Sequence, residues 1–272
     1  MFTGIVALAA LCAVTLVAPP REAPLLVSAA ISLTDALEEI AAAYVRAGGG
    51  AIRFNFAGSN VLARQIANGA PSDLFISADE AQMHFARAAG AVGRPEPLLG
   101  NRLAIVTPAA AHRITGLDQL ASARRIAIGD PAAVPAGVYA RRYLESAGLW
   151  DRIQPQLVPL ANVRSALAAA ESGGVDAAIV YESDAAASKR VRLAFVVDER
   201  RAPAIIYPAA IVANSPNKQA AARFLAFLRG REAGAIFKRH RFCPLAPTAG
   251  AALCGVGSRR LSVERLVSYP QA

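Results

Sequence analysis

The stretch Leu25–Val45, with the sequence LLVSAAISLTDALEEIAAAYV, contains an apolar run followed directly by a helical pattern. Leu25 to Ala29 consists of apolar and small residues, which is typical of a strand that is buried on both faces. After it, apolar residues recur at helical spacing from Leu33 to Tyr44, and three glycines at 48–50 stop the pattern. A strand that leads directly into a helix is the repeating unit of α/β folds, so this stretch predicts the fold class.

The same alternation continues along the chain. Further strand-like segments are 52–56, 73–77, 103–106, 126–128, 157–160 and 177–180. Helical patterns lie between several of these segments, and two more follow at 218–228 and 232–240. The order of elements predicts an α/β protein with mostly parallel sheets.

Two apolar stretches, 101–106 and 204–212, are interpreted as points where the chain crosses between two lobes. This assigns residues 23–102 and 213–242 to a first lobe and 103–212 to a second lobe. Residues 243–272, rich in Gly, Ala and Pro, are assigned to a C-terminal tail. A bilobal protein of this kind binds its ligand in the cleft between its two α/β lobes.

The composition restricts the class of protein. The chain has 272 residues, of which 54% are apolar and 18% charged, so it buries a sizeable core and is not globally disordered. The formal net charge is +9, but the arginines are scattered singly and in pairs such as Arg124-Arg125, without interleaved aromatic residues. This pattern argues against nucleic-acid binding and leaves an anionic ligand or a solvated basic surface.

The N-terminus has the character of an export signal. Residues 5–17 are apolar and uncharged, and Pro19-Pro20-Arg21 ends the run, which is too short for a typical membrane span. No basic residue precedes the run, so residues 1–22 are interpreted as a signal peptide or, alternatively, an N-terminal anchor. Either interpretation predicts a periplasmic or otherwise extracytoplasmic protein. Cys243 and Cys254 either form a disulfide there or remain free thiols.

Small and polar residues stand at the starts of four predicted helices. They are Ser32, Ser59-Asn60, Pro135-Ala136-Gly137 and Asn162. Ser32 also has Asp35 three residues further on, which fits a capping box. In parallel α/β sheets helix starts gather at one edge, where free N–H groups and the helix dipoles favour an anion. Each of these residues alone is as well explained by simple helix capping.

Several longer motifs resemble one known family, the molybdate-binding proteins of bacterial ABC importers, a branch of the type II periplasmic binding proteins. The resemblance runs from about Leu25 to Phe242. The motifs are Ser32-Leu33-Thr34-Asp35-Ala36, Gly58 to Ile66 (GSNVLARQI), Gly69 to Asp79 (GAPSDLFISAD), Leu99 to Leu103 (LGNRL), Gly129-Asp130-Pro131, Val134-Pro135-Ala136-Gly137, Asn162-Val163-Arg164, Ile179-Val180-Tyr181 and Asp184-Ala185.

The resemblance implies a set of ligand-binding residues. The oxyanion would be held by the hydroxyl groups of Ser32, Ser59 and Tyr181 and by the backbone amides of Ala136 and Val163. Molybdenum would be present only within bound molybdate or tungstate, with no cofactor. The implied partners are an ABC importer permease and its cytoplasmic ATPase, and the protein is expected to be a monomer. Ile31, Gly58 and Asn60 depart from the family pattern, which leaves the size of the pocket open.

The proposed ligands suit a fully deprotonated anion. Molybdate is a dianion that only accepts hydrogen bonds, whereas phosphate at neutral pH carries a proton for which these residues offer no carboxylate. Another oxyanion such as sulfate, or a small carboxylate, is the alternative. An exported hydrolase is disfavoured, because none of the three histidines, His84, His112 and His240, adjoins a nucleophile motif, and no metal cluster or Walker loop is present.

Overall fold

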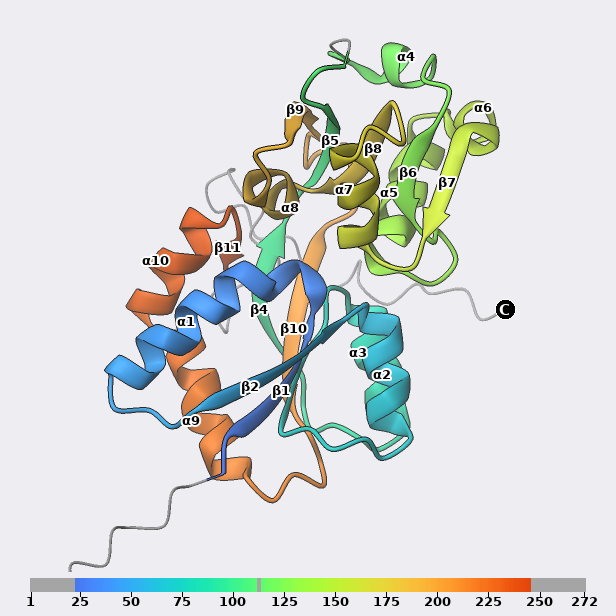
Figure 1. The fold of residues 1–272 in the computed structure, drawn as a ribbon. Coiled ribbons are helices and arrows are strands. Elements are labelled where there is room, and N and C mark those ends of the chain that lie inside the picture. The colour runs from blue at the N-terminus through green and yellow to red at the C-terminus, as the bar shows by residue number, and fades with distance from the viewer. Residues whose placement is uncertain (1–22, 112–113, 246–272) are drawn as a thin grey trace, which may run out of the picture.

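The computed structural model describes residues 23–111 and 114–245 and divides them into two lobes, one above the other in Figure 1. The predicted signal or anchor at 1–22 and nearly all of the predicted tail lie outside these residues. Within the described ranges, no helix has the length and apolar character needed to cross a membrane.

The first lobe is built on a six-stranded sheet with the order β11-β4-β10-β3-β1-β2. Its strands are β1 (Leu25–Ala30), β2 (Ile52–Ala57), β3 (Leu74–Ile76), β4 (Glu96–Asn101), β10 (Ile205–Ile211) and β11 (Cys243–Pro244). β1 is parallel to β2 and β3, whereas β10 is antiparallel to both β3 and β4. The apolar run that opens this lobe is therefore a central strand.

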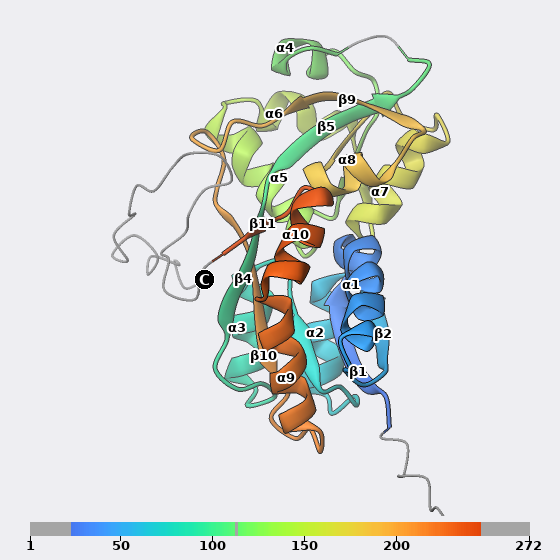
Figure 2. The ribbon, with the colours of Figure 1, turned by 90° about the vertical axis from the view of Figure 1, so that its left-hand side faces the viewer.

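Helices cover both faces of this sheet (Figures 1 and 2). One face carries α1 (Thr34–Arg46), α9 (Lys218–Leu228) and α10 (Arg231–Arg239), and the other carries α2 (Ser59–Ala67) and α3 (Glu80–Ala88). β3 shows why its residues are continuously apolar: Leu74 and Ile76 pack in the core that includes α1, and Phe75 packs in the core that includes α2 and α3. Alternate side chains point to opposite faces, and both faces are buried.

The second lobe has a five-stranded sheet with the order β7-β6-β8-β5-β9. Its strands are β5 (Leu103–Pro108), β6 (Ile126–Gly129), β7 (Leu157–Leu160), β8 (Ala177–Tyr181) and β9 (Val191–Val196). Its helices are α4 (Leu117–Leu120), α5 (Pro135–Ser146), α6 (Trp150–Ile153), α7 (Val163–Glu171) and α8 (Glu182–Ala187), with two short 3₁₀ turns, η1 (Ile31–Leu33) in the first lobe and η2 (Gln154–Gln156) in the second.

The chain crosses between the lobes twice. β4 continues through Arg102 into β5, which the view of Figure 2 shows as one long path. The second crossing follows β9 and leads back to β10. The two crossing segments are tied together at the base of the second lobe, where the Val197 N–H donates to the Leu103 carbonyl at 2.8 Å.

Two details of the predicted organisation are wrong. β10 pairs with β3 and β4, so Ile205–Ile211 belongs to the first lobe. The second crossing therefore lies before residue 205, whereas the sequence predicted that it ends at residue 212. The sheets are also mixed rather than mostly parallel, because β10 and β5 run against their neighbours. An apolar strand that is buried on both faces fits either sheet, so only its long-range pairing decides where it belongs.

The start of the predicted tail is part of the first lobe. Cys243 and Pro244 pair with β4, and the Leu245 N–H donates to the Leu98 carbonyl at 2.9 Å. Cys243 is disulfide-bonded. Cys254, its predicted partner, lies outside the described residues.

Candidate functional site

A small cavity lies between the lobes, where several helix starts meet. The centre of a water-sized sphere can move through about 10 Å³ of it, so the cavity is narrow and admits only a compact ligand. The residues around it come from both lobes: Ala30, Ile31, Ser32, Ala57, Gly58, Ser59, Ala78, Val134, Pro135, Ala136, Asn162, Val163 and Tyr181. All five residues predicted to bind the ligand are among them, so the fold brings these distant positions together.

Three of the helix starts at this cavity lack a side-chain cap for their first N–H groups. η1, α2 and α5 have no side-chain hydrogen bond at their N-caps. α7 is capped by Asn162, whose Oδ1 accepts from the Ser165 N–H at 2.9 Å. This cap does not engage the N–H of Val163, the first residue of the helix. The first N–H groups of a helix have no intrahelical acceptor, and a buried one needs a partner. An anion in the cavity would provide that partner.

The predicted capping box at Ser32 and Asp35 is wrong. α1 begins at Thr34, after the separate turn η1, and its N-cap Leu33 makes no side-chain bond. The Ser32 hydroxyl instead lies 3.0 Å from the Tyr207 hydroxyl, and Asp35 pairs with Arg164. Ser32 and Asp35 therefore each contact a residue far away in the sequence, and they do not form the helix cap that their spacing predicted.

Ser59 is arranged as a donor toward the cavity. Its Oγ accepts a hydrogen bond from the Ala78 N–H at 2.9 Å, and the residue is buried. Since a hydroxyl has one proton and can also accept, this bond leaves the proton of Ser59 for another partner. α2 begins at Ser59 itself, with Gly58 as its N-cap, so the serine lies in the first turn rather than before it.

Glycine at position 58 leaves room for the side chain of Asn60. A Cβ there would lie 2.7 Å from Asn60 Oδ1 and 3.5 Å from the carbonyl oxygen of Ala161 in the second lobe. Asn60 itself is buried but does not line the cavity. The two departures from the family pattern are therefore linked, because the glycine leaves the room that the Asn60 side chain occupies.

A second glycine positions the Ala136 amide. A Cβ at Gly137 would lie 2.0 Å from the Gly129 carbonyl oxygen, so any other residue would push the start of α5 away from the end of β6. This contact explains the Val134-Pro135-Ala136-Gly137 motif: the glycine seats the helix start against the strand end, and Pro135 occupies a first-turn position where no N–H is needed.

Tyr181, at the end of β8, presents an unpaired hydroxyl group. The residue is 1% exposed, and within the described part of the chain its Oη has no hydrogen-bond partner. Desolvation by burial raises the pKa of this phenol well above its ordinary value, so it remains a neutral donor at neutral pH. A buried hydroxyl without a partner is unfavourable unless a ligand accepts from it.

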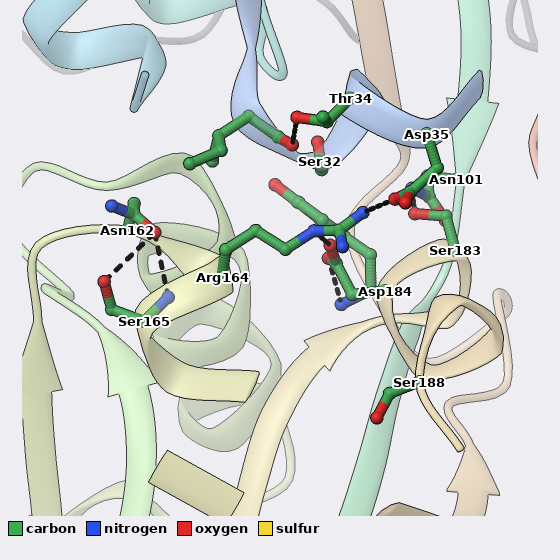
Figure 3. A network of polar contacts seen from close by, with 12 residues as sticks. Ser32, Thr34, Asp35, Asn101, Asn162, Arg164, Ser165, Ser183, Asp184 and Ser188 are labelled. Carbon is green, nitrogen blue, oxygen red and sulfur yellow. Dashed lines mark hydrogen bonds and ion pairs between the residues drawn. The ribbon is translucent and has the colours of Figure 1, made fainter. Parts of the chain in front are cut away.

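An ion-pair network next to the cavity joins the two lobes (Figure 3). Arg164, which follows Val163, lies between Asp35 of the first lobe and the buried Asp184 of the second. Its Nε is 2.7 Å from Asp184 Oδ1, and its Nη2 contacts Asp35 Oδ2. Desolvation raises the pKa of Asp184 to about 6 even though Arg164 acts to lower it. The other oxygen of Asp184 accepts from the Tyr181 N–H at 3.3 Å, so the network also holds the end of β8.

The charged side chains of Asp35, Arg164 and Asp184 lie next to the cavity but do not line it. None of the described residues that line the cavity is a carboxylate, an ammonium or a guanidinium group. Among the described residues no group of three or more His, Cys, Asp or Glu side chains is placed to hold a metal ion. Of the histidines, His240 pairs with Glu39 on the surface, and His112 lies outside the described residues. The chemistry of the cavity is that of neutral donors.

Asp79 provides a testable pH effect close to the cavity. It follows Ala78 and caps α3 by accepting from the Gln82 N–H at 2.9 Å, and its burial raises its pKa to about 6 from an ordinary 3.8. Since the folded-state pKa is the higher one, the folded protein prefers the protonated form. The ionised carboxyl therefore reduces stability above pH 6, and this cost disappears as the pH falls toward 4.

We expect Asp79→Asn to be more stable than the wild type at pH 8 by on the order of 3 kcal/mol, because the amide keeps the cap without a buried charge. The difference should shrink toward zero near pH 4. Urea unfolding of both proteins at several pH values measures it. A difference that does not change with pH contradicts the assignment of the effect to Asp79.

The residues that contact the cavity lining from behind were not predicted from the sequence. Tyr207 and Asn101 contact Ser32 directly or through one another, although neither was proposed for the site. Arg164 and Asp184 stood within the quoted motifs without an assigned role. Asn101, at the end of an apolar strand, was the available signal, but its partners Ser183 and Tyr207 are 82 and 106 positions away in the sequence.

Comparison with known proteins identifies the family of this chain. A family model described as bacterial extracellular solute-binding protein matches residues 25–242. This chain belongs to that family. Its members bind solutes and are not enzymes, in agreement with the predicted class of protein and the two-lobed fold.

Named relatives define the branch of the family. The chain is 40% identical to the molybdate-binding protein ModA of Escherichia coli (strain K12), over 81% of this chain and 89% of that protein. It is 33% identical to ModA of Haemophilus influenzae, over 70% of this chain and 79% of that protein. A solved structure of the periplasmic molybdate-binding protein of Azotobacter vinelandii superposes with a TM-score of 0.73 at 25% identity, covering 82% and 99% of the two chains. The predicted resemblance is thereby confirmed.

Proposed function

We propose that this protein captures molybdate, and also tungstate, outside the cytoplasm and delivers it to an ABC importer. The observation that carries the proposal is a cavity lined by neutral donors from both lobes, with no charged side chain among the lining residues that the structure describes. The donors proposed are the hydroxyl groups of Ser32, Ser59 and Tyr181 and the amides of Ala136 and Val163. The names of the relatives support the same ligand.

The donor set favours an anion without protons. Molybdate offers only acceptors, which match a cavity in which Ser59 and Tyr181 each have a proton to donate. Phosphate at neutral pH carries a proton, and no lining carboxylate is available to accept it. A donor buried without a partner costs about 1–3 kcal/mol, which disfavours phosphate. Sulfate also lacks a proton, so the size of the cavity must distinguish it from molybdate.

The absence of charged lining residues does not prevent binding of a dianion. A buried charge is costly unless its hydrogen bonds are complete, and each charge-assisted bond contributes roughly 1.5–3 kcal/mol. The starts of α2, α5 and α7 add the favourable ends of three helix dipoles. Fixed neutral dipoles therefore take the role that lysine or arginine has in other anion sites.

Capture and delivery follow from the two-lobed arrangement. The proposed ligands come from both lobes, so binding favours the closed form in which Asp35 and Arg164 meet. The closed form is the one that a permease with its cytoplasmic ATPase would recognise. We also propose that the protein acts as a monomer, because each chain contributes both halves of its own site.

Titration of the purified protein against four oxyanions tests the proposal. At a hundredfold excess over Kd, molybdate or tungstate is expected to raise the melting temperature by about 5–10 °C, because ligand binding adds about 2.7 kcal/mol to the free energy of unfolding. Sulfate and phosphate at the same concentration should have little effect. Equal shifts from sulfate and molybdate, or no shift from molybdate, contradict the proposal.

A further inference from the structure

We propose that Asn101 and Tyr207 are positioning residues that turn the hydroxyl proton of Ser32 toward the bound oxyanion. The inference rests on the proposed function, since it concerns how that anion is recognised. Neither residue lines the cavity. They would act through a chain of hydrogen bonds whose direction is set by the amide of Asn101.

The three residues form a buried line behind the cavity. Asn101 Nδ2 lies 3.3 Å from Tyr207 Oη, and Tyr207 Oη lies 3.0 Å from Ser32 Oγ. All three residues are at most 5% exposed, so water does not compete for these contacts. Asn101 ends β4 at the first crossing and Tyr207 lies in β10, the strand that returns from the second lobe. The line therefore runs from the crossing strands to the cavity.

The orientation of the Asn101 amide is determined by its other contacts. Its Oδ1 accepts from the Arg102 N–H at 2.8 Å, and its Nδ2 also lies 2.9 Å from the Ser183 hydroxyl (Figure 3 labels Asn101 and Ser183). A flipped amide would place NH₂ against the Arg102 N–H, two donors facing each other. The NH₂ group therefore faces Tyr207.

This orientation sets the direction of the remaining bonds. The Tyr207 oxygen accepts from Asn101, so its single proton is donated onward. The Tyr181 hydroxyl also adjoins Tyr207. Within the described residues it makes no hydrogen bond of good geometry, so Ser32 Oγ, at 3.0 Å, is the acceptor that we assign. Burial also raises the pKa of Tyr207, which keeps the phenol protonated. Because Ser32 Oγ then accepts from Tyr207, the proton of Ser32 is left for the cavity.

The consequence is selectivity as well as affinity. A serine hydroxyl by itself can donate or accept, so it would serve a protonated oxyanion as readily as a deprotonated one. With one lone pair engaged by Tyr207, Ser32 has its proton free for the cavity and less capacity to accept. Ser59 is directed in the same way by the Ala78 N–H, through the backbone rather than through side chains. Both serines thus favour an anion without protons.

A double-mutant cycle measures this coupling. Molybdate Kd is determined by calorimetry for wild type, Tyr207→Phe, Ser32→Ala and the double variant. We expect Tyr207→Phe to weaken binding by about tenfold to a hundredfold, the range of one charge-assisted hydrogen bond. In the Ser32→Ala background the same change should cost less than threefold. The matched control is Tyr44→Phe, a tyrosine near the far end of α1, which should leave Kd unchanged.

A second variant tests direction and does not depend on the stability of Tyr207→Phe. In Asn101→Asp the carboxylate accepts the Tyr207 proton, so the Tyr207 oxygen accepts from Ser32 and Ser32 offers lone pairs to the cavity. We expect the ratio of molybdate to hydrogen phosphate affinity, measured by competition, to fall at least tenfold. A role in folding or general charge repulsion would weaken both anions equally.

Additive losses in the cycle, or an unchanged anion ratio in Asn101→Asp, overturn the inference even if the wild type binds molybdate tightly. Failure of the wild type to bind molybdate would instead contradict the proposed function, so the two results are distinguishable.

Discussion

Replacing Ser32 and Ser59 together by alanine is expected to weaken molybdate binding by about 10²- to 10⁴-fold, the largest effect on affinity that we predict. Each serine provides one charge-assisted hydrogen bond worth roughly 1.5–3 kcal/mol, and tenfold in Kd corresponds to about 1.4 kcal/mol. Both residues are buried and line the cavity. The loss should be seen in the Kd measured by calorimetry, and the ligand-dependent rise in melting temperature should disappear.

The double variant should still fold. Ser59→Ala leaves the Ala78 N–H without its acceptor, at a cost of about 1–3 kcal/mol, which is less than the stability of most domains. Circular dichroism and the melting temperature of the ligand-free protein test this. Ser72→Ala, which removes another buried hydroxyl of the first lobe that does not line the cavity, is the control and should bind normally. If the double variant keeps its affinity within tenfold, the ligand binds elsewhere.

Replacing Arg164 by alanine is expected to have the largest effect on stability, a loss of about 3–5 kcal/mol at pH 7. Asp184 is completely buried and Arg164 is its cationic partner, so the substitution leaves a buried carboxylate without compensation. The substitution also removes the contact with Asp35 that joins the lobes. Urea unfolding gives the difference in free energy directly.

Two further variants separate the buried charge from other causes. Asp184→Asn in the Arg164→Ala background removes the uncompensated charge and should restore most of the lost stability. Arg190→Ala breaks a pair with Glu171 in which the arginine side chain is 69% exposed, so its cost should stay below about 1 kcal/mol. If the double variant is no more stable than Arg164→Ala, the loss arises from packing rather than from the charge of Asp184.

Local patterns predicted much of the fold because they depend on neighbours in the sequence. The period of apolar residues in 218–228 predicted α9 with the bounds that the structure has, and the segment 157–160 is likewise a strand. Asn162 precedes a helix and caps it, as such a residue usually does. The capping box predicted at Ser32 is wrong because Ser32 lies within the turn η1, and α1 begins only at Thr34.

The sequence by itself determined the α/β class, the places of strands β1 to β3 and β5 to β8, and the helix starts at Ser59, Ala136 and Val163. These properties follow from spacing and from residue type within a few positions.

The tertiary structure alone decided that β10 returns to the first sheet, that Asp35 and Asp184 share Arg164, and that Asn101 and Tyr207 stand behind Ser32. The Ser32–Tyr207 contact joins residues 175 positions apart, and the Asp35–Arg164 contact joins residues 129 apart. Polar side chains have no periodic pattern that identifies such partners. The direction of their hydrogen bonds follows only when the folded chain fixes all neighbours of each group.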